Sequence, residues 1–243
     1  MKNFFKKIIE LLFPNQCLHC SHLIGQEGVF CNDCWKKLQF ITDPKCNICC
    51  HPFEYKVADN LICGKCLGNK PSYDRVITVF RYNSVIKKII GDFKYRDNTY
   101  LAKKFAKILF NRASTEIAKI DLIVAVPLHK IRLRKRKFNQ AILLTKELSK
   151  LSKKKFFYDF LLRVKNTTAQ AGLRKREREK NLRGAFALNK KYEKIVKGKK
   201  VLLIDDVMTT GTTLENCAKV LKKAGAKEVI VLVIAKRVFN QIH

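Results

Sequence analysis

Two hydrophobic patterns alternate along most of the chain. Short runs rich in Val, Ile and Phe predict β-strands, and longer segments with apolar residues at helical spacing predict α-helices. The predicted strands are residues 75–82, 121–126, 156–162, 200–204 and 228–234. The predicted helices are residues 85–93, 99–112, 138–151 and 212–224.

Alternation of strands and helices predicts an α/β fold, with a mostly parallel sheet covered by helices on both faces. Ligands of such sheets bind beyond the carboxyl ends of the strands. The alternation starts near Pro71, after a segment of different composition. We therefore expect three parts: a short helix over residues 1–15, a cysteine-rich domain over 16–70 and an α/β domain over 71–243.

The first fourteen residues combine bulky apolar side chains with Lys and Glu, which indicates an amphipathic helix and not a secretory signal. We expect this helix to dock on the protein body or on a partner, or less readily on a membrane surface. No run approaches the ~18–20 apolar residues that a bilayer span requires. We therefore predict no transmembrane segment.

Cysteine spacing gives the first chemical signal. Of ten cysteines, nine precede residue 67, and eight of these form four C-x-x-C pairs. Two such pairs can enclose one Zn²⁺ ion tetrahedrally, and the metal would supply folding free energy to a segment with little core of its own. The simplest pairing gives two structural Cys₄ zinc ribbons, although spacing alone does not fix which pairs combine. The predicted ligands are Cys17, Cys20, Cys31, Cys34, Cys46, Cys49, Cys63 and Cys66.

A disulfide framework and an iron–sulfur cluster are the alternatives to zinc. The missing secretion signal argues against disulfides and favours a reducing, cytoplasmic location. Cys50 and the nearby His19, His22 and His51 could replace a ligand. A spare thiol or a contact to a ligand is the more ordinary role for each of them.

The most informative motif is residues 201–214, in which an apolar strand is followed by two acids, a Thr/Gly loop and a helix. The acids Asp205 and Asp206 would accept hydrogen bonds from sugar hydroxyls. The loop that begins the helix would bind a phosphate through backbone N–H groups and hydroxyls. This polarity suits a ribose 5-phosphate. The alternative is an ordinary strand-to-helix turn capped by threonines.

Six of the eight residues 130–137, which follow the strand at 121–126, are basic. A loop of this charge at a strand end could hold a diphosphate, with Arg132, Arg134 and Arg136 as the candidate side chains. A solvated run of surface charge is the alternative. The whole chain carries 51 Lys and Arg against 20 Asp and Glu, a formal charge of +31. Such a charge favours nucleic acid or a phosphorylated ligand, unless it reflects only a lysine-rich surface.

Residues 201–214 resemble the diphosphate-sugar motif of the type I phosphoribosyltransferases. The resemblance implies binding of phosphoribosyl diphosphate with Mg²⁺. Asp205 and Asp206 would bind the ribose hydroxyls, and the arginines would stabilise the diphosphate leaving group. Any catalysis would be displacement at the anomeric carbon, as in a glycosyltransferase. The residues implied to bind the 5-phosphate are Thr209, Thr210, Gly211, Thr212 and Thr213.

The order of motifs resembles one narrower family, the ComF-type proteins. Its features are the four cysteine pairs, a Phe-Lys-Tyr-Arg segment, a Val-Pro-Leu segment followed by Arg-Lys-Phe-Asn-Gln, and a Gln-x-x-Leu to Ala-Phe stretch. These features lie at residues 17–66, 93–96, 126–140 and 170–186. Two positions depart from the family: Lys137 and Asp97 stand where Gly is usual.

The ComF resemblance implies a role in the uptake of transforming DNA. Single-stranded DNA and DNA-uptake proteins become expected partners. Basic residues 174–183 would neutralise the DNA backbone, and Trp35, Phe40 or Tyr95 could stack on bases, unless each is simply a core residue. The alternative function is a metabolic phosphoribosyltransferase in salvage or sugar-phosphate metabolism. The acceptor would be chosen by the hood at 165–186 together with the N-terminal domain, where no base-binding pattern is evident.

Overall fold

The computed structural model describes residues 15–25, 28–55, 61–95, 98–165 and 184–239, without the side chains of Arg132 and Lys135. The predicted N-terminal helix, Asp97 and most of the hood segment lie outside these residues. No described helix has the length and apolarity to cross a membrane.

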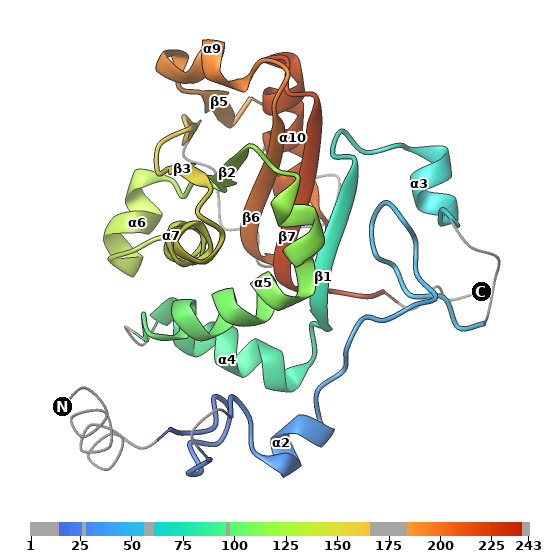
Figure 1. Ribbon diagram of the computed structural model, residues 1–243, viewed down its shortest axis with the longest axis vertical. Helices are drawn as coiled ribbons and strands as arrows, with labels where there is room; N and C mark the ends of the chain where they lie inside the picture. The colour runs from blue at the N-terminus through green and yellow to red at the C-terminus, as the bar shows by residue number, and fades with distance from the viewer. Residues whose placement is uncertain (1–14, 26–27, 56–60, 96–97, 166–183, 240–243) are drawn as a thin grey trace.

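A five-stranded, fully parallel sheet forms the centre of the molecule (Figure 1). Its strand order confirms the predicted α/β class and leaves β1 at one edge and β3 at the other. The order is β1 (Arg75–Arg81), β7 (Glu228–Lys236), β6 (Lys200–Met208), β2 (Leu122–Ala125) and β3 (Lys155–Phe157).

Helices cover both faces of the sheet, because the side chains of the central strands are apolar on either face. On β6, Leu202 and Ile204 face a core shared with α4, α5 and α7. Val201 and Leu203 face a second core shared with α10. Such two-sided burial explains the unbroken apolar runs of β6 and β7. The covering helices are α4 (Ser84–Tyr95), α5 (Leu101–Ala118), α7 (Gln140–Ser152) and α10 (Thr212–Lys223).

The single strand predicted over 156–162 is wrong. The chain turns at Tyr158 and Asp159, so that β3 stays in the main sheet and β4 (Leu161–Arg163) pairs antiparallel with β5 (Phe186–Leu188). Polar anchoring explains the turn, because Asp159 accepts hydrogen bonds from Tyr192 Oη at 2.7 Å and Asn189 Nδ2 at 3.1 Å. Two short helical turns follow β5, namely η1 (Lys190–Tyr192) and α9 (Glu193–Val196).

The basic segment after β2, predicted as a loop, instead contains the helix α6 (Lys130–Arg136). Its residues are long-chained helix formers with no Gly or Pro, and the His129 side chain caps the first turn by accepting from the Ile131 N–H. The strand β6 also continues past the predicted end at residue 204 and includes both acids.

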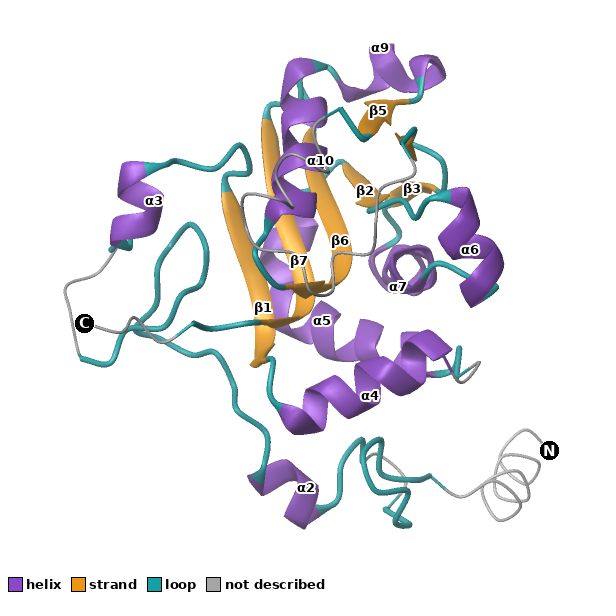
Figure 2. Ribbon diagram, turned by 180° about the vertical axis from the view of Figure 1, so that it is seen from behind, coloured by secondary structure: helices purple, strands orange, loops and turns teal. Residues whose placement is uncertain are grey.

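The described part of the cysteine-rich segment is mostly loop, with two short helices, α2 (Asn32–Lys36) and α3 (Gly64–Gly68) (Figure 2). It runs alongside β1, the edge strand. The Phe40 backbone bridges to Phe80, the Ile41 N–H donates to the Val79 carbonyl, and the Val76 N–H donates to the Ile48 carbonyl.

Candidate functional site

A cavity of about 650 Å³ lies beyond the carboxyl ends of the sheet strands. Its walls come from the last residues of β6 and the residues that follow β1, β2, β6 and β7, together with the end of α4, the strand β4, the start of α10 and the junction of α6 and α7. This is the position expected for a ligand of a parallel α/β sheet. It brings together most of the predicted binding residues: Asp205, Asp206, Thr209, Thr210, Gly211, Thr212, Thr213 and Arg136.

A larger hollow of about 1130 Å³ lies against the first cysteine cluster. It is lined by that ribbon's own loops and by ligand cysteines, and it contains no pair of carboxylates. The chemistry predicted from the sequence is therefore concentrated in the smaller cavity at the sheet edge.

The carboxylate pair sits at the end of β6, where two acids in a row share one cavity. The Asp206 N–H donates to Asp205 Oδ1 at 2.9 Å, and the Asp206 side chain is paired with the Lys94 ammonium, Nζ to Oδ2 2.7 Å. The surrounding protein and the charge of Asp206 raise the pKa of Asp205 to about 7, although the cavity leaves part of its side chain accessible. Asp205 therefore exchanges its proton close to neutral pH, next to the lysine-paired Asp206.

The threonine loop turns the chain from β6 into α10. Gly211 has a φ of +83°, which favours glycine, and a Cβ there would lie 2.7 Å from Met208 Cε. The hydroxyls of Thr210 and Thr212 lie 3.0 Å apart. The start of α10, a twelve-residue helix, lines the cavity beside these hydroxyls. Backbone N–H groups and hydroxyls at a helix N-terminus are suited to a phosphate.

The first turn of α10 is also fixed from the outside. Ser72 donates to the Glu215 carboxylate from both its backbone N–H and its hydroxyl, each at 2.8 Å. The segment that links the second cysteine cluster to β1 thus holds the helix whose start forms the candidate phosphate site.

The three arginines predicted in the basic segment do not behave alike. Arg136 lines the cavity and donates to Tyr95 Oη at 3.1 Å. Arg134 is exposed and is absent from the cavity wall, because residues two apart on a helix point in different directions. The side chain of Arg132 lies outside the described residues.

Sequence reasoning missed three other basic residues in the cavity wall, namely Lys94, Arg163 and Arg237. They come from the end of α4, from β4 and from the residue after β7. Lys94 was part of a family motif but received no role. The position of Arg237, three residues after the end of the predicted strand 228–234, was a usable signal, whereas the place of Arg163 depends on the unpredicted turn at Asp159.

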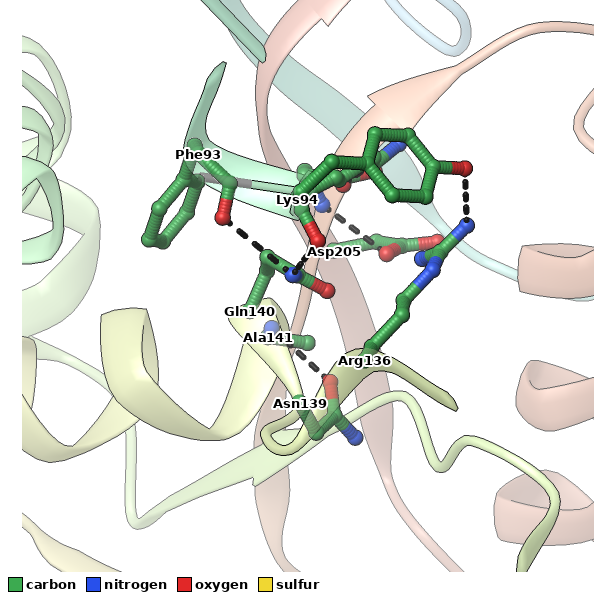
Figure 3. Close-up of polar contacts among 9 residues, drawn as sticks. Phe93, Lys94, Arg136, Asn139, Gln140, Ala141 and Asp205 are labelled. Atoms are coloured by element: carbon green, nitrogen blue, oxygen red, sulfur yellow. Dashed lines mark hydrogen bonds and ion pairs between the residues drawn. The ribbon is translucent and has the colours of Figure 1, made fainter. Parts of the chain in front are cut away.

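The role of Asn139 and Gln140 was also missed (Figure 3). Asn139 caps α7 by accepting from the Ala141 N–H at 2.9 Å. The Asn139 amide also donates to the Val126 carbonyl at 3.0 Å. Gln140 donates to the Phe93 carbonyl at 3.3 Å. These two amides tie the start of α7 to the end of β2 and to the end of α4.

Lys137 adopts a φ of +64° at the end of α6. A left-handed conformation costs a residue with a side chain roughly 1 kcal/mol or more. The usual glycine of the family at this position therefore has a conformational reason, and this chain keeps the turn with a lysine.

The eight predicted zinc ligands form two groups of four, within each of which all sulfur atoms lie within 4.8 Å of one another. Zn–S bonds of ~2.3 Å place tetrahedral sulfurs roughly 3.8 Å apart, so both groups fit the ion. All ten cysteines lie in the described part of the chain and are free, so the disulfide alternative is wrong. Ribbon 1 is Cys17, Cys20, Cys31 and Cys34, and ribbon 2 is Cys46, Cys49, Cys63 and Cys66.

The neighbouring candidates for metal binding have other contacts. Cys50 donates its thiol to the Val76 carbonyl of β1 at 2.7 Å, which anchors ribbon 2 to the sheet. His19 Nδ1 lies 3.3 Å from the Cys34 sulfur of ribbon 1. Neither residue belongs to a four-sulfur group, and neither do His22 and His51.

Known proteins share both halves of this architecture. Residues 8–67 match the family described as "Double zinc ribbon domain", and residues 101–238 match "Phosphoribosyl transferase domain". Over most of its length the chain is also 30% identical to "Competence protein F" of Haemophilus influenzae, across 92% of this chain and 98% of that protein. The chain belongs to the ComF family.

Other ComF relatives show similar coverage. "DNA utilization protein YhgH" of Escherichia coli K12 is 31% identical over 90% of this chain and 96% of its own length. "Competence protein ComFC" of Streptococcus pneumoniae is 28% identical over 85% of this chain and 87% of its own length. The ComF chain therefore combines a double zinc ribbon with a phosphoribosyltransferase domain, as the sequence predicted.

Proposed function

We propose that this ComF protein binds phosphoribosyl diphosphate in the cavity at the sheet edge and single-stranded DNA on its basic surface, in the cytoplasm, during the handling of imported DNA. The printed names of the relatives, competence and DNA utilization proteins, support the second part. The phosphoribosyltransferase domain supports the first. DNA-uptake proteins are the expected partners.

One observation carries the sugar-phosphate part of the proposal: the carboxylate pair of β6 and the threonine loop line the same cavity. Carboxylates accept hydrogen bonds from ribose hydroxyls, and the loop offers donors to the 5-phosphate. Burial of either carboxylate under the apolar core would have removed this chemistry. Both instead face a space that a small ligand can enter.

The charge of the cavity fits a polyanion. Four basic side chains and two carboxylates line it, so the wall carries a net positive charge of about two. The basic residues Arg136, Arg163 and Arg237 would hold the diphosphate and stabilise its charge if it leaves the sugar. Mg²⁺, when bound with the diphosphate, would neutralise further charge.

The Asp205→Asn/Asp206→Asn double variant tests this site. Asn keeps the shape of both side chains but loses the negative charges, so binding of phosphoribosyl diphosphate is expected to disappear while the fold and zinc content persist. Calorimetric titration measures the affinity. The exposed Asp43→Asn is the matched control, and unchanged affinity of the double variant would refute the site.

Exposed aromatic rings support the DNA part of the proposal. Trp35 is 55% exposed and Tyr95 is 68% exposed, so the expectation that each is a core residue is wrong. The Phe40 ring packs between Trp35 and Phe80 with both centroid distances 5.1 Å, and it remains partly exposed. Such rings can stack on unpaired bases beside the lysines that neutralise phosphates.

Anisotropy of a labelled oligonucleotide at increasing salt tests DNA binding. A DNA-binding protein should lose affinity steeply as the logarithm of salt concentration rises. At a fixed salt concentration, Trp35→Ala should bind the oligonucleotide more weakly than the wild type. Saturable phosphoribosyl diphosphate binding without any salt-dependent DNA binding would instead support a metabolic phosphoribosyltransferase.

A further inference from the structure

Lys94 lies inside the candidate sugar site, at the carboxylate pair itself. Its ammonium is 2.7 Å from Asp206 Oδ2, and the two side chains are only 20% and 10% exposed. An ion pair buried to this degree differs from a surface pair, because removing one partner leaves an uncompensated charge in the protein. The cavity wall therefore already supplies a cation, Lys94, next to the two aspartates.

The backbone at Lys94 is held firmly (Figure 3). Lys94 is in the last turn of α4, where backbone carbonyls have no helical partner. The Gln140 side chain, 2% exposed, donates to the carbonyls of Phe93 at 3.3 Å and Lys94 at 3.5 Å. Because Gln140 begins α7, the Lys94 backbone is fixed at a junction of α4 and α7, unlike that of a lysine on an exposed loop.

The electrostatics keep this lysine charged. Burial is the largest single influence and opposes the charge, but the attraction of Asp206 and Asp205 together outweighs it, and the pKa of Lys94 is raised. Arg136 adds a second positive charge to the same wall. A divalent cation that needed Asp206 as a ligand would have to displace the ammonium and approach this arginine. A sugar hydroxyl meets no such conflict, since it can donate to a carboxylate and accept from an ammonium.

We propose that Lys94 is the resident cation of the carboxylate pair and that it determines what the pair binds, admitting sugar hydroxyls and excluding a divalent metal ion. The hydroxyl part rests on the proposed function, whereas the exclusion of metal does not. Under this proposal any Mg²⁺ reaches the cavity with the diphosphate and is not held by Asp206.

Mn²⁺ alone, titrated into zinc-loaded protein and followed by the electron paramagnetic resonance of the free ion, tests the exclusion of metal. Lys94→Met removes the charge at similar side-chain volume, and it should raise the affinity for Mn²⁺ at least about tenfold, equivalent to about 1.4 kcal/mol. Lys94→Gln, which keeps a donor to Asp206, should show the same rise if Met at this position impairs folding. Lys94→Arg should bind Mn²⁺ as weakly as the wild type.

Two controls locate the effect. Lys222→Met breaks another ion pair, 2.7 Å from Asp74 and outside the cavity wall, and it should leave Mn²⁺ binding unchanged. Adding Asp206→Asn to Lys94→Met should cancel the gain. Unchanged Mn²⁺ affinity in both folded Lys94→Met and Lys94→Gln would overturn the proposal. If the wild type does not bind phosphoribosyl diphosphate, the proposed function is refuted, but the metal test remains valid.

Discussion

At the scale of single residues, the two neighbouring aspartates of β6 have different electrostatic settings. Asp206 has the Lys94 ammonium at hydrogen-bonding distance. Asp205 is instead surrounded by protein and lies next to the negative charge of Asp206. The pKa of Asp205, raised to about 7, means that its proton is exchanged close to neutral pH. The same residue type thus lies beside a lysine in one position and titrates close to neutral pH in the other.

This difference predicts a pH dependence of stability. Between an unfolded pKa near 3.9 and a folded pKa of about 7, only the folded state holds the Asp205 proton, so the free energy of unfolding falls as the pH rises through this window. Asp205→Asn should flatten this fall and be more stable than the wild type at pH 8, on the order of a few kcal/mol. Urea unfolding of zinc-loaded protein between pH 5.5 and 8 measures it. Parallel profiles for wild type and variant would contradict the assignment.

At the scale of elements, the junction of α4, α6 and α7 assembles one wall of the cavity. The helix α6 selects which of its arginines faces the ligand, and the amides of Asn139 and Gln140 fix the start of α7 to its neighbours.

This geometry predicts unequal effects of two similar substitutions. Arg136→Ala should weaken phosphoribosyl diphosphate binding roughly 10- to 100-fold, since a charged hydrogen bond contributes about 1.5–3 kcal/mol. Arg134→Ala removes the same charge from the exposed side of α6 and should leave affinity nearly unchanged. Calorimetric titration of both variants at one ionic strength decides the point. Equal losses would mean that α6 acts only through its overall charge.

The sequence was sufficient for the elements with strong local signals. The four cysteine pairs predicted both ribbons, and the run around Asp205 predicted a strand, two acids and a helix start. Local patterns failed where a distant contact decides the structure. The turn at Asp159 depends on Tyr192, and the ion pair of Lys94 depends on packing between α4 and the sheet. Neither contact leaves a periodic pattern in the sequence.

At the scale of the whole molecule, the two ribbons differ in burial. All four sulfur ligands of ribbon 2 are buried, and Lys236 of β7 donates to the Cys49 carbonyl within it. Ribbon 1 has Cys20 exposed and Cys31 partly exposed, and it packs beside α4, where Lys88 donates to the His19 carbonyl at 2.8 Å. Ribbon 2 is therefore the more integral part of the sheet domain.

This difference predicts stepwise loss of zinc. The protein should contain about two zinc ions per chain, and a chelator should remove the ion of ribbon 1 faster, because its ligands are accessible. A chromogenic metal indicator should record two phases, and only the slow phase should lower the melting temperature strongly. Cys20→Ser should abolish the fast phase. A single phase, or no zinc in freshly reduced protein, would contradict this assignment.

The course of the cysteine-rich segment along β1 also has a protective effect. An uncovered outer strand offers unpaired backbone N–H and C=O groups to any other extended chain, and the five inner residues of β1 are buried in this structure. Residues 39–41 and 48 occupy several of those groups. A fragment beginning at Pro71 would lose this cover, and we expect it to self-associate through β1, so that the ribbons guard the enzyme-like half against aggregation.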